Sequence, residues 1–157
     1  MVTIIDPHIK MDKEYHISKE ATDKSLFVMN SRHLPFDGWC WPGSSQWIDF
    51  ENPRAKDWWA SQFSYDRYLG STKNLFIWND MNEPSVFTGP EITLPKDAMH
   101  YNRVEHRSIH NIYGAMFVST NQLYERLSHR VVPLLTCDNR INLATEYYIS
   151  MLLLLKV

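Results

Sequence analysis

The stretch that most constrains the fold of this chain is NLFIWNDMNEPSVF, at residues 74–87. Its apolar run, LFIW, consists of strand-favouring residues and indicates a buried strand. The polarity changes directly after this run: Asp80 and Glu83 lie among two amides, and Pro84 cannot continue an internal strand. Parallel sheets and barrels carry catalytic groups at the carboxyl ends of their strands, so this pattern predicts a site on such a fold. The simpler alternative is a polar strand end that only caps a turn.

Other apolar runs and helical patterns alternate with this strand along the chain. The sequence predicts short strands at residues 2–5, 25–29 and 131–136, and helices within 10–24 and at 52–63, 110–130 and 146–157. Asn52 and Pro53 form a helix start, with a capping side chain before a proline at the first helical position. Strands and helices that alternate over short connections indicate a parallel α/β fold. A buried strand at the first residues leaves a sheet edge unpaired, so further strands are expected before it.

The helical spacing also predicts which side chains are buried. In the helix at 52–63, Trp58 and Phe63 are expected to pack against a sheet rather than to bind a ligand. The expected buried face of the helix at 110–130 comprises Ile112, Met116, Leu123 and Leu127. Both helices are thus expected to cover the sheet that carries the polar strand ends.

The length and charge of the chain argue against several classes of function. With 157 residues it can form one domain with a core, but not a complete eight-stranded α/β barrel. Its formal net charge of -2 gives no electrostatic reason to expect a nucleic-acid or membrane partner. No apolar segment approaches the ~20 residues that a membrane-spanning helix needs, and no secretory signal is visible at the first residues. Cys40 and Cys137 form neither a metal motif nor an evident disulfide framework.

Asp80 and Asp138 are the strand-end carboxylates that could act as a pair of acid and base. Glycoside hydrolysis needs such a pair, because one group protonates the leaving oxygen while the other attacks the anomeric carbon or activates water. In a retaining enzyme the two carboxyl groups lie ~5 to 5.5 Å apart, and in an inverting enzyme they lie farther apart. Glu83 could be the partner of Asp80 instead, although its position on the following turn favours a supporting role as a hydrogen-bond acceptor.

Residues 38–50, GWCWPGSSQWIDF, contain three tryptophans among turn residues. Trp39, Trp41 and Trp47 cannot all lie on one regular face, so we expect a structured loop whose indoles line or cover something. Anchoring of this loop to the core by its own aromatic residues is an equally good interpretation. The same tryptophans support a second hypothesis for the function, a non-catalytic carbohydrate-binding or interaction fragment that uses them as a stacking surface.

His100, His106 and His110, together with Glu105, suggest a third hypothesis, a metal-dependent hydrolase. His106 and His110 lie one helical turn apart, as two metal ligands on a helix do. The order Glu-His-x-x-x-His differs from the metalloprotease pattern, however, in which the glutamate follows the first histidine. We therefore expect no metal site, and interpret the histidines as residues at a helix start that form hydrogen bonds with loop carbonyl groups.

The sequence IWNDMNEPSVF is accompanied by DPHIK upstream, by GWCWPG between the two, and by GPE, PKDAMHY and EHRSIHNIYG downstream. With these motifs the chain closely resembles the catalytic barrel of glycoside hydrolase family 31, and within that family the neutral α-glucosidases of the glucosidase II type. The likeness covers residues 1–114 almost without gaps. It implies an α/β fold, a partial (β/α)8 TIM barrel. It also implies a retaining α-glucosidase that needs no cofactor or metal and acts on α-linked glucose of N-glycans or oligosaccharides.

The same resemblance implies roles for particular residues. Asp80 falls on the position of the catalytic nucleophile, which forms a glycosyl-enzyme ester. Ile4, Trp41, Trp78 and Phe87 fall on positions that shape the glucose subsite. The glucosidase II type also implies the lumen of the endoplasmic reticulum as the location and a non-catalytic regulatory subunit as a partner.

The end of the chain departs from the family pattern. Residues 1–136 are family-like, whereas residues 137–157 are divergent, as though a segment had been lost and the sequence resumed at Asp-Asn. Asp138 is therefore the candidate acid/base, although the tryptophan and glycine that precede this aspartate in the family are absent. We accordingly interpret residues 1–157 as a fragment of the family's catalytic barrel and expect it to be inactive by itself.

Overall fold

The computed structural model describes residues 1–127 and 135–136. Sheet A is parallel, and its strands lie in the order β1 (Val2–Ile5), β5 (Phe76–Asn79) and β6 (Leu135–Thr136). Sheet B is antiparallel, in the order β2 (His8–Lys10), β4 (Gly43–Trp47) and β3 (Gly38–Cys40). The described helices are α1 (His16–Asp23), α2 (Pro53–Ser61), α3 (His106–Leu127) and the short 3-10 helix η1 (Tyr101–Arg103). This α/β architecture with an open parallel sheet confirms the predicted fold class.

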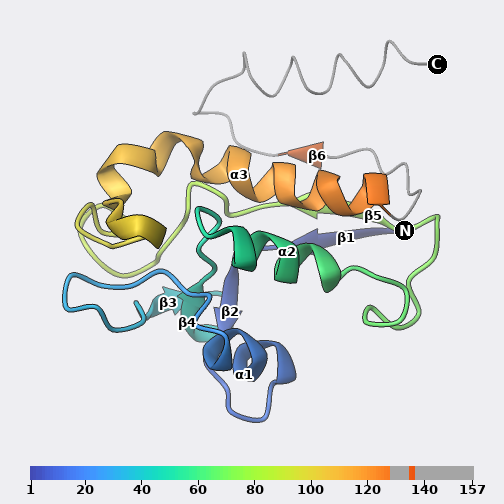
Figure 1. Cartoon of the computed structure of the whole chain (residues 1–157), viewed down its shortest axis with the longest axis horizontal. Helices are drawn as coiled ribbons and strands as arrows, with labels where there is room; N and C mark the ends of the chain where they lie inside the picture. Colours follow the sequence, from blue (N-terminus) through green and yellow to red (C-terminus); the bar gives the residue numbers. More distant parts are fainter. Residues whose placement is uncertain (128–134, 137–157) are drawn as a thin grey trace.

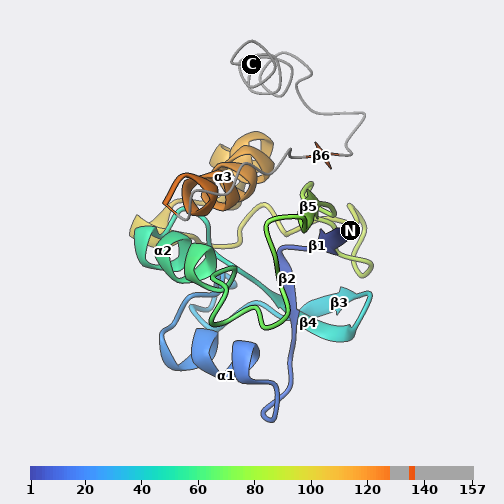
Figure 2. The same cartoon turned by 90° about the vertical axis from the view of Figure 1, so that its right-hand side faces the viewer.

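The helices α2 and α3 lie side by side and cover the same side of sheet A, whereas α1 lies near β2 (Figure 1). Figure 2 shows β1 and β5 on one side and the two helices on the other. Aromatic side chains fill the space between these layers. The ring of Phe50 lies 5.5 Å from the ring of Trp59 and 5.0 Å from that of Phe117, measured between centroids. Burial of these large rings is the main apolar contribution to the helix-on-sheet contact.

Helix α2 begins where the sequence predicts. The Asn52 Oδ1 accepts a hydrogen bond from the Arg54 N–H at 3.0 Å, and Pro53 is the first helical residue. This cap satisfies one of the backbone N–H groups that have no partner within a helix. Trp58 and Phe63 are buried in the core, which confirms their predicted packing role.

The buried face of α3 differs from the predicted one. Ile109, Tyr113 and Phe117 are buried, whereas Ile112 is 50% exposed, so the prediction was wrong for Ile112. Met116 packs against the core as expected. The two aromatic rings bury more apolar area than the aliphatic alternative, and this difference decides which face of the helix turns inward.

Several predicted boundaries also change. Helix α3 starts at His106 rather than at His110. The strand predicted at 25–29 forms only isolated bridges to neighbouring segments. The helix predicted at 146–157 and the side chains of Leu123 and Leu127 lie outside the described residues. In the described part of the chain, no helix has both the length and the apolar character needed to cross a membrane.

The segment at 38–50, which was predicted to be a structured loop, contains a β-hairpin. Strands β3 and β4 pair in antiparallel register, with Cys40 opposite Gly43 across a tight turn. Gly43 has a φ of 97°, a left-handed conformation that glycine adopts at little cost. The prediction was wrong because the side chains alternate between the two faces of the hairpin: Trp39 is exposed and Cys40 is buried. The tryptophans therefore need no common face.

Strand β1 forms as predicted, but only one of its faces is buried. Val2 and Ile4 are 50% and 52% exposed, whereas Ile5 packs against the core. Among the described strands, β1 pairs only with β5, in a register that aligns Ile5 with Asn79 and Ile4 with Trp78. The prediction of a fully buried strand was therefore wrong for β1, because no described element covers the face that carries Ile4.

Candidate active site

Asp80 is the first residue beyond β5, at the carboxyl end of sheet A. Its N–H donates to the Ile5 carbonyl oxygen at 3.1 Å, which extends the pairing of β1 and β5 by one residue. Its Oδ1 accepts a hydrogen bond from the Met81 N–H at 2.9 Å. Because Asn79 faces the core and side chains alternate along a strand, Asp80 lies on the same face of the sheet as Trp78. The half-buried carboxylate is thus held at the sheet end with one oxygen anchored.

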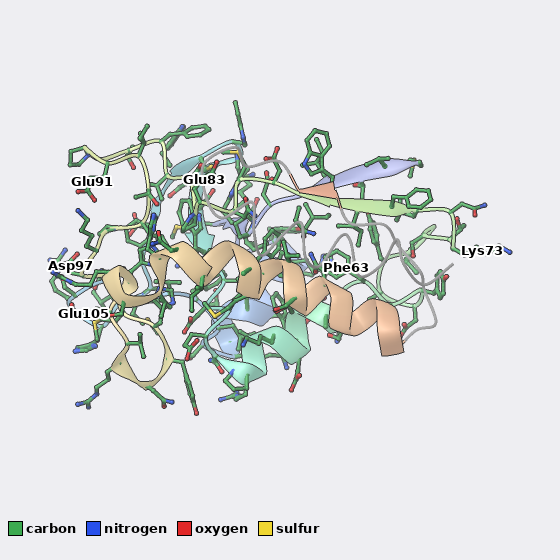
Figure 3. The ribbon with its side chains drawn as sticks, turned by 90° about the horizontal axis from the view of Figure 1, so that it is seen from above. Phe63, Lys73, Glu83, Glu91, Asp97 and Glu105 are labelled. Carbon is green, nitrogen blue, oxygen red and sulfur yellow. The ribbon has the colours of Figure 1, made fainter. Side chains whose placement is uncertain are left out.

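Two further carboxyl groups lie near Asp80. Asp6 follows β1 as Asp80 follows β5, and the parallel register places the two residues side by side. Glu83 lies on the segment after β5, where its Oε2 accepts a hydrogen bond from the Ser85 hydroxyl at 2.7 Å. Figure 3 shows Glu83 and Lys73 at opposite ends of β5. Burial, together with the negative charges of Asp80 and Glu83, raises the pKa of Asp6 to about 6.

Asp6 is a candidate site residue that the sequence pattern did not select. A signal was present, because the apolar run of β1 ends at Asp6 as the run before Asp80 ends in polar residues. The pattern alone does not say which strands are neighbours. Only the pairing of β1 with β5 shows that the two polar ends meet.

Buried amides join β5 to the helices behind Asp80. The Asn121 Nδ2 donates to the Asn79 Oδ1, and the Trp59 Nε1 donates to the Asn121 Oδ1 at 2.8 Å. All three of these side chains are buried. Because buried hydrogen bonds of this kind have strict geometry, they fix the end of β5, and with it Asp80, against α2 and α3.

Gly114 brings α3 against the acidic segment. A Cβ at this position would lie 2.9 Å from the Asn82 carbonyl oxygen, a distance that leaves no room for a side chain. The backbone of α3 therefore approaches the turn between Asp80 and Glu83 directly. This contact explains why a glycine stands in the middle of a helix, where it is otherwise unfavourable.

Exposed apolar and aromatic groups lie on the hairpin and on the segment after Glu83. Trp41 and Phe87 are 70% and 40% exposed, and their rings meet edge to face with centroids 4.8 Å apart. The Phe87 N–H donates to the Trp39 carbonyl oxygen at 2.7 Å, which ties this segment to the hairpin. Ile4 is half-exposed beside Trp78. An aromatic wall next to carboxylates suits a sugar, although the subsite roles of Ile4, Trp41, Trp78 and Phe87 stay predictions.

Trp47 does not contribute to a stacking surface. Its side chain is fully buried, with its ring centroid 5.5 Å from that of Phe36. Strand β4 turns this indole into the core, so the hypothesis of a surface made by all three tryptophans was wrong for Trp47. Trp39 and Trp41 are exposed.

The histidines form a hydrogen-bonded chain that starts at the buried Asp49 and ends at the partly buried His110. The Asp49 Oδ1 lies 2.7 Å from the His100 Nδ1, and the His100 Nε2 lies 3.0 Å from the His106 Nδ1. The His106 Nε2 lies 2.8 Å from the His110 Nδ1. A carboxylate only accepts hydrogen bonds, so the His100 Nδ1–H donates to Asp49, whereas the donor and acceptor roles between the rings depend on the tautomer of each histidine. We name these four residues the Asp49 relay.

The hydrogen-bond partners of the histidines in the Asp49 relay differ from the predicted ones. Their hydrogen bonds run to one another and to Asp49, so the predicted loop carbonyl partners were wrong. Within residues 1–127 and 135–136, no group of three His, Cys, Asp or Glu side chains could hold a metal ion, and the metal-dependent hydrolase finds no support there. Burial, assisted by His100 and His110, lowers the pKa of His106 to about 3. The relay therefore joins three segments through a His106 ring that is uncharged at neutral pH.

An open groove of about 740 Å³ lies beside β1, β2 and α1. Its lining residues include Asp6, His8, Trp41 and Arg67. Asp6 thus borders both this groove and the carboxylates at the end of sheet A.

Asp138 lies outside the described residues, and its role as the acid/base partner of Asp80 stays a prediction. Strand β6, which ends at Thr136, lies parallel to β5 with Thr136 aligned to Asn79. Sheet A therefore continues beyond β5 on the side away from β1.

Comparisons with known proteins give consistent matches. A family model described as the glycosyl hydrolases family 31 TIM-barrel domain matches residues 1–138. The chain is 59% identical over 114 residues to the neutral alpha-glucosidase AB of Dictyostelium discoideum, a match that covers 73% of this chain and 12% of that protein. The chain therefore spans about an eighth of the length of this curated relative.

The solved structures that resemble the chain include two of glucosidase II. One is a glucosidase II alpha subunit in its alpha3-Glc2-bound form, with 50% identity and a TM-score of 0.77, covering 78% of this chain and 13% of that one. The other is the heterodimeric complex of endoplasmic reticulum glucosidase II, which contains a catalytic subunit and the binding domain of a regulatory subunit. It has 45% identity and a TM-score of 0.78, and the match covers 86% of this chain and 16% of that one.

Proposed function

This chain belongs to glycoside hydrolase family 31, and we propose that it is part of the catalytic barrel of an α-glucosidase in which Asp80 is the nucleophile. One observation carries the proposal: Asp80 follows β5 at the carboxyl end of a parallel sheet, on the same face as Trp78. Trp41 and Phe87 supply exposed rings against which a sugar can lie. Carboxyl ends of barrel strands are where this fold carries its catalytic groups.

The reaction that we propose has two steps. In the first, a carboxylate oxygen of Asp80 bonds to the anomeric carbon while the bond from this carbon to the leaving oxygen breaks, and an acid transfers a proton to that oxygen. In the second, the same acid, now a base, takes a proton from water, which attacks the anomeric carbon and releases Asp80. We assign the acid/base role to Asp138. The Met81 N–H holds one oxygen of Asp80, so the other oxygen is the one that attacks.

The substrate that we propose is α-linked glucose of N-glycans or oligosaccharides. The similarity to a neutral alpha-glucosidase and to an alpha3-Glc2-bound glucosidase II subunit supports this assignment. Glucose has an apolar ring face that can stack on Trp41 or Phe87, and it carries no charge that the acidic segment would repel. By the same similarity we propose the lumen of the endoplasmic reticulum as the location and a non-catalytic regulatory subunit as a partner.

Covalent trapping tests the proposed nucleophile. The host protein is a chimera in which residues 1–114 of this chain replace the matching stretch of the Dictyostelium discoideum relative, so that the rest of the barrel is present. A mechanism-based α-glucosidase inhibitor is expected to label the peptide that contains Asp80, because such a reagent forms a stable ester with the attacking carboxylate. The Asp80→Asn chimera serves as the control and should not be labelled. A label on any other residue would overturn the assignment.

We expect the 157-residue chain by itself to hydrolyse no α-glucoside above the uncatalysed background. In the described residues β1 pairs on one side only, and Val2 and Ile4 are half-exposed, so the barrel wall next to Asp6 and Asp80 is open to water. A site open to bulk water loses most of its electrostatic advantage. The measurement is hydrolysis of a chromogenic α-glucoside together with urea-induced unfolding. Cooperative unfolding combined with turnover would contradict this expectation.

A non-catalytic carbohydrate-binding fragment is the second candidate function. The exposure of Trp39 and Trp41 on the hairpin favours it, since exposed indoles stack on sugar rings. Sugar binding that is unchanged by Asp80→Asn but lost on replacement of Trp41 by alanine, without turnover in the chimera, would support this function over hydrolysis.

A further inference from the structure

Asp6 lies where a charge acts directly on the proposed reaction. Strands β1 and β5 end at the aligned pair Ile5 and Asn79, so Asp6 and Asp80 are neighbours across a parallel ladder. Neighbouring strands are ~4.8 Å apart, and both side chains extend from the face of sheet A that does not carry the core. A charge on Asp6 therefore lies about one strand spacing from Asp80, and thus close to the sugar that Asp80 would attack.

The carboxyl group of Asp6 has no strong partner among the described residues. Its Oδ1 is buried without a hydrogen bond, and its Oδ2 lies 3.6 Å from the His8 Nε2. The His8 side chain is only 2% exposed, and burial lowers its pKa to about 4. At neutral pH this imidazole is uncharged, so it does not neutralise Asp6. The Asp6 side chain is 22% exposed, and a partly buried carboxylate without a compensating cation has a desolvation cost that is typical of functional sites.

We propose that Asp6 assists the reaction at Asp80 electrostatically. Its ionised carboxylate strengthens the negative potential at the sheet end and stabilises the positive charge that develops on the sugar ring. The proposal rests on the proposed glycosidase function. It needs no contact between Asp6 and the sugar, because an unscreened charge acts over several ångströms in a partly buried site. The transition state of glycoside hydrolysis has oxocarbenium character, so a nearby negative charge favours it over the neutral substrate.

The surroundings of Asp6 determine when it is ionised. Asp80 and Glu83 face it from the segment after β5, His8 from β2, and Cys40 from β3. The other titratable or charged residues that line the groove beside it are Lys10, Tyr15, His16, Arg67 and Tyr68. Burial and the two like charges raise the pKa of Asp6 to about 6. Asp6 is therefore ionised above pH 6 and largely protonated at pH 5, which makes its contribution dependent on pH.

The replacement Asp6→Asn in the chimera tests the proposal, because asparagine has the shape of protonated aspartic acid at every pH. We expect kcat for a chromogenic α-glucoside to fall about tenfold at pH 7.5, with KM changed less than about twofold. At pH 5 the variant and the unmodified chimera should have the same kcat within about twofold, since Asp6 of the unmodified chimera is then protonated and as uncharged as the asparagine that replaces it. A loss that is equal at pH 5 and pH 7.5, or no loss at pH 7.5, would overturn the proposal.

The matched control is Asp57→Asn, which removes a carboxylate from the exposed side of α2. The kcat of this variant should equal that of the unmodified chimera at every pH.

A second measurement does not depend on activity: carboxyl-carbon NMR titration of the 157-residue chain, with and without Asp80→Asn. We expect the pKa of Asp6 to be near 6 and to fall when Asp80 loses its charge. An Asp6 pKa near 3.8 in the folded chain would reject the proposed role of Asp6, even if the inhibitor labels Asp80. A failure of the inhibitor to label Asp80 would instead reject the proposed function.

Discussion

Replacement of Asp80 by asparagine in the chimera is expected to lower kcat/KM for an α-glucoside by about 10⁴-fold or more. The amide has nearly the same shape and its oxygen can still accept the hydrogen bond from the Met81 N–H, so the turn after β5 should be preserved. What is lost is the nucleophile, because an amide oxygen cannot form the glycosyl ester. Initial rates with a chromogenic α-glucoside measure the effect, and circular dichroism shows whether the variant is folded.

The matched variant is Glu83→Gln, which removes the other carboxylate of the same segment. Glu83 accepts a hydrogen bond from the Ser85 hydroxyl, and glutamine can accept the same bond. Because Glu83 is proposed only to support the turn, its replacement should cost about tenfold or less. Retention of more than a tenth of the activity by Asp80→Asn, or a larger loss in Glu83→Gln than in Asp80→Asn, would show that Asp80 is not the nucleophile.

Disruption of the Asp49 relay is expected to have the largest effect on stability. In His106→Phe an apolar ring replaces the imidazole, and both of its hydrogen bonds are lost. The His100 Nε2 and the His110 Nδ1 then have lost their partner in the relay. Each buried polar group left without a partner costs about 1–3 kcal/mol, so the free energy of unfolding at pH 7 should fall by about 3 kcal/mol. Urea-induced unfolding of the 157-residue chain, followed by tryptophan fluorescence, measures this change.

The same replacement should flatten the pH dependence of stability. Because burial lowers the pKa of His106 from 6.5 to about 3, the folded chain binds fewer protons than the unfolded chain between these values. This contribution is fully present above pH 6.5 and is lost as the pH falls towards 3. His8 titrates in the same direction, whereas Asp6, with its pKa raised from 3.8 to about 6, acts in the opposite direction. The cost of His106→Phe should therefore be clearly smaller at pH 4.5 than at pH 7.

His16→Phe is the control for the relay, since His16 is exposed at the start of α1. Its effect should stay within about 0.5 kcal/mol at both pH values. A cost of less than about 1 kcal/mol for His106→Phe at pH 7, or a cost that does not change with pH, would mean that the relay does not hold its three segments together.

The relay and the proposed site are connected through α3. His106 and His110 connect the first turns of this helix, through His100, to Asp49, which lies two residues after the end of β4. Further along the same helix, Gly114 touches the Asn82 carbonyl oxygen on the acidic segment. A shift of α3 would therefore move the turn that carries Asp80, which is a physical reason for a buried polar chain so close to the candidate site.

Local patterns predicted those parts of the fold that neighbouring residues decide. The apolar run before Asp80, and the cap and proline at Asn52 and Pro53, specify a strand end and a helix start from residues a few positions apart. The hairpin at 38–50 was not predicted, because tryptophans that share no single face were interpreted as a loop, whereas the side chains of paired strands alternate between two faces. The inward face of α3 was missed at Ile112 because several apolar stripes fit the helix equally well.

The sequence by itself determined that Asp80 directly follows an apolar strand, that the fold is α/β, and that the chain resembles a family of glycoside hydrolases. Only the tertiary structure decided that Asp6 lies beside Asp80, that Trp47 is in the core, and that the histidines form a chain from Asp49. The physical reason is that strand register, side-chain burial and buried hydrogen bonds depend on contacts between distant segments. Their free energies appear only once the chain has packed, and no local pattern contains them.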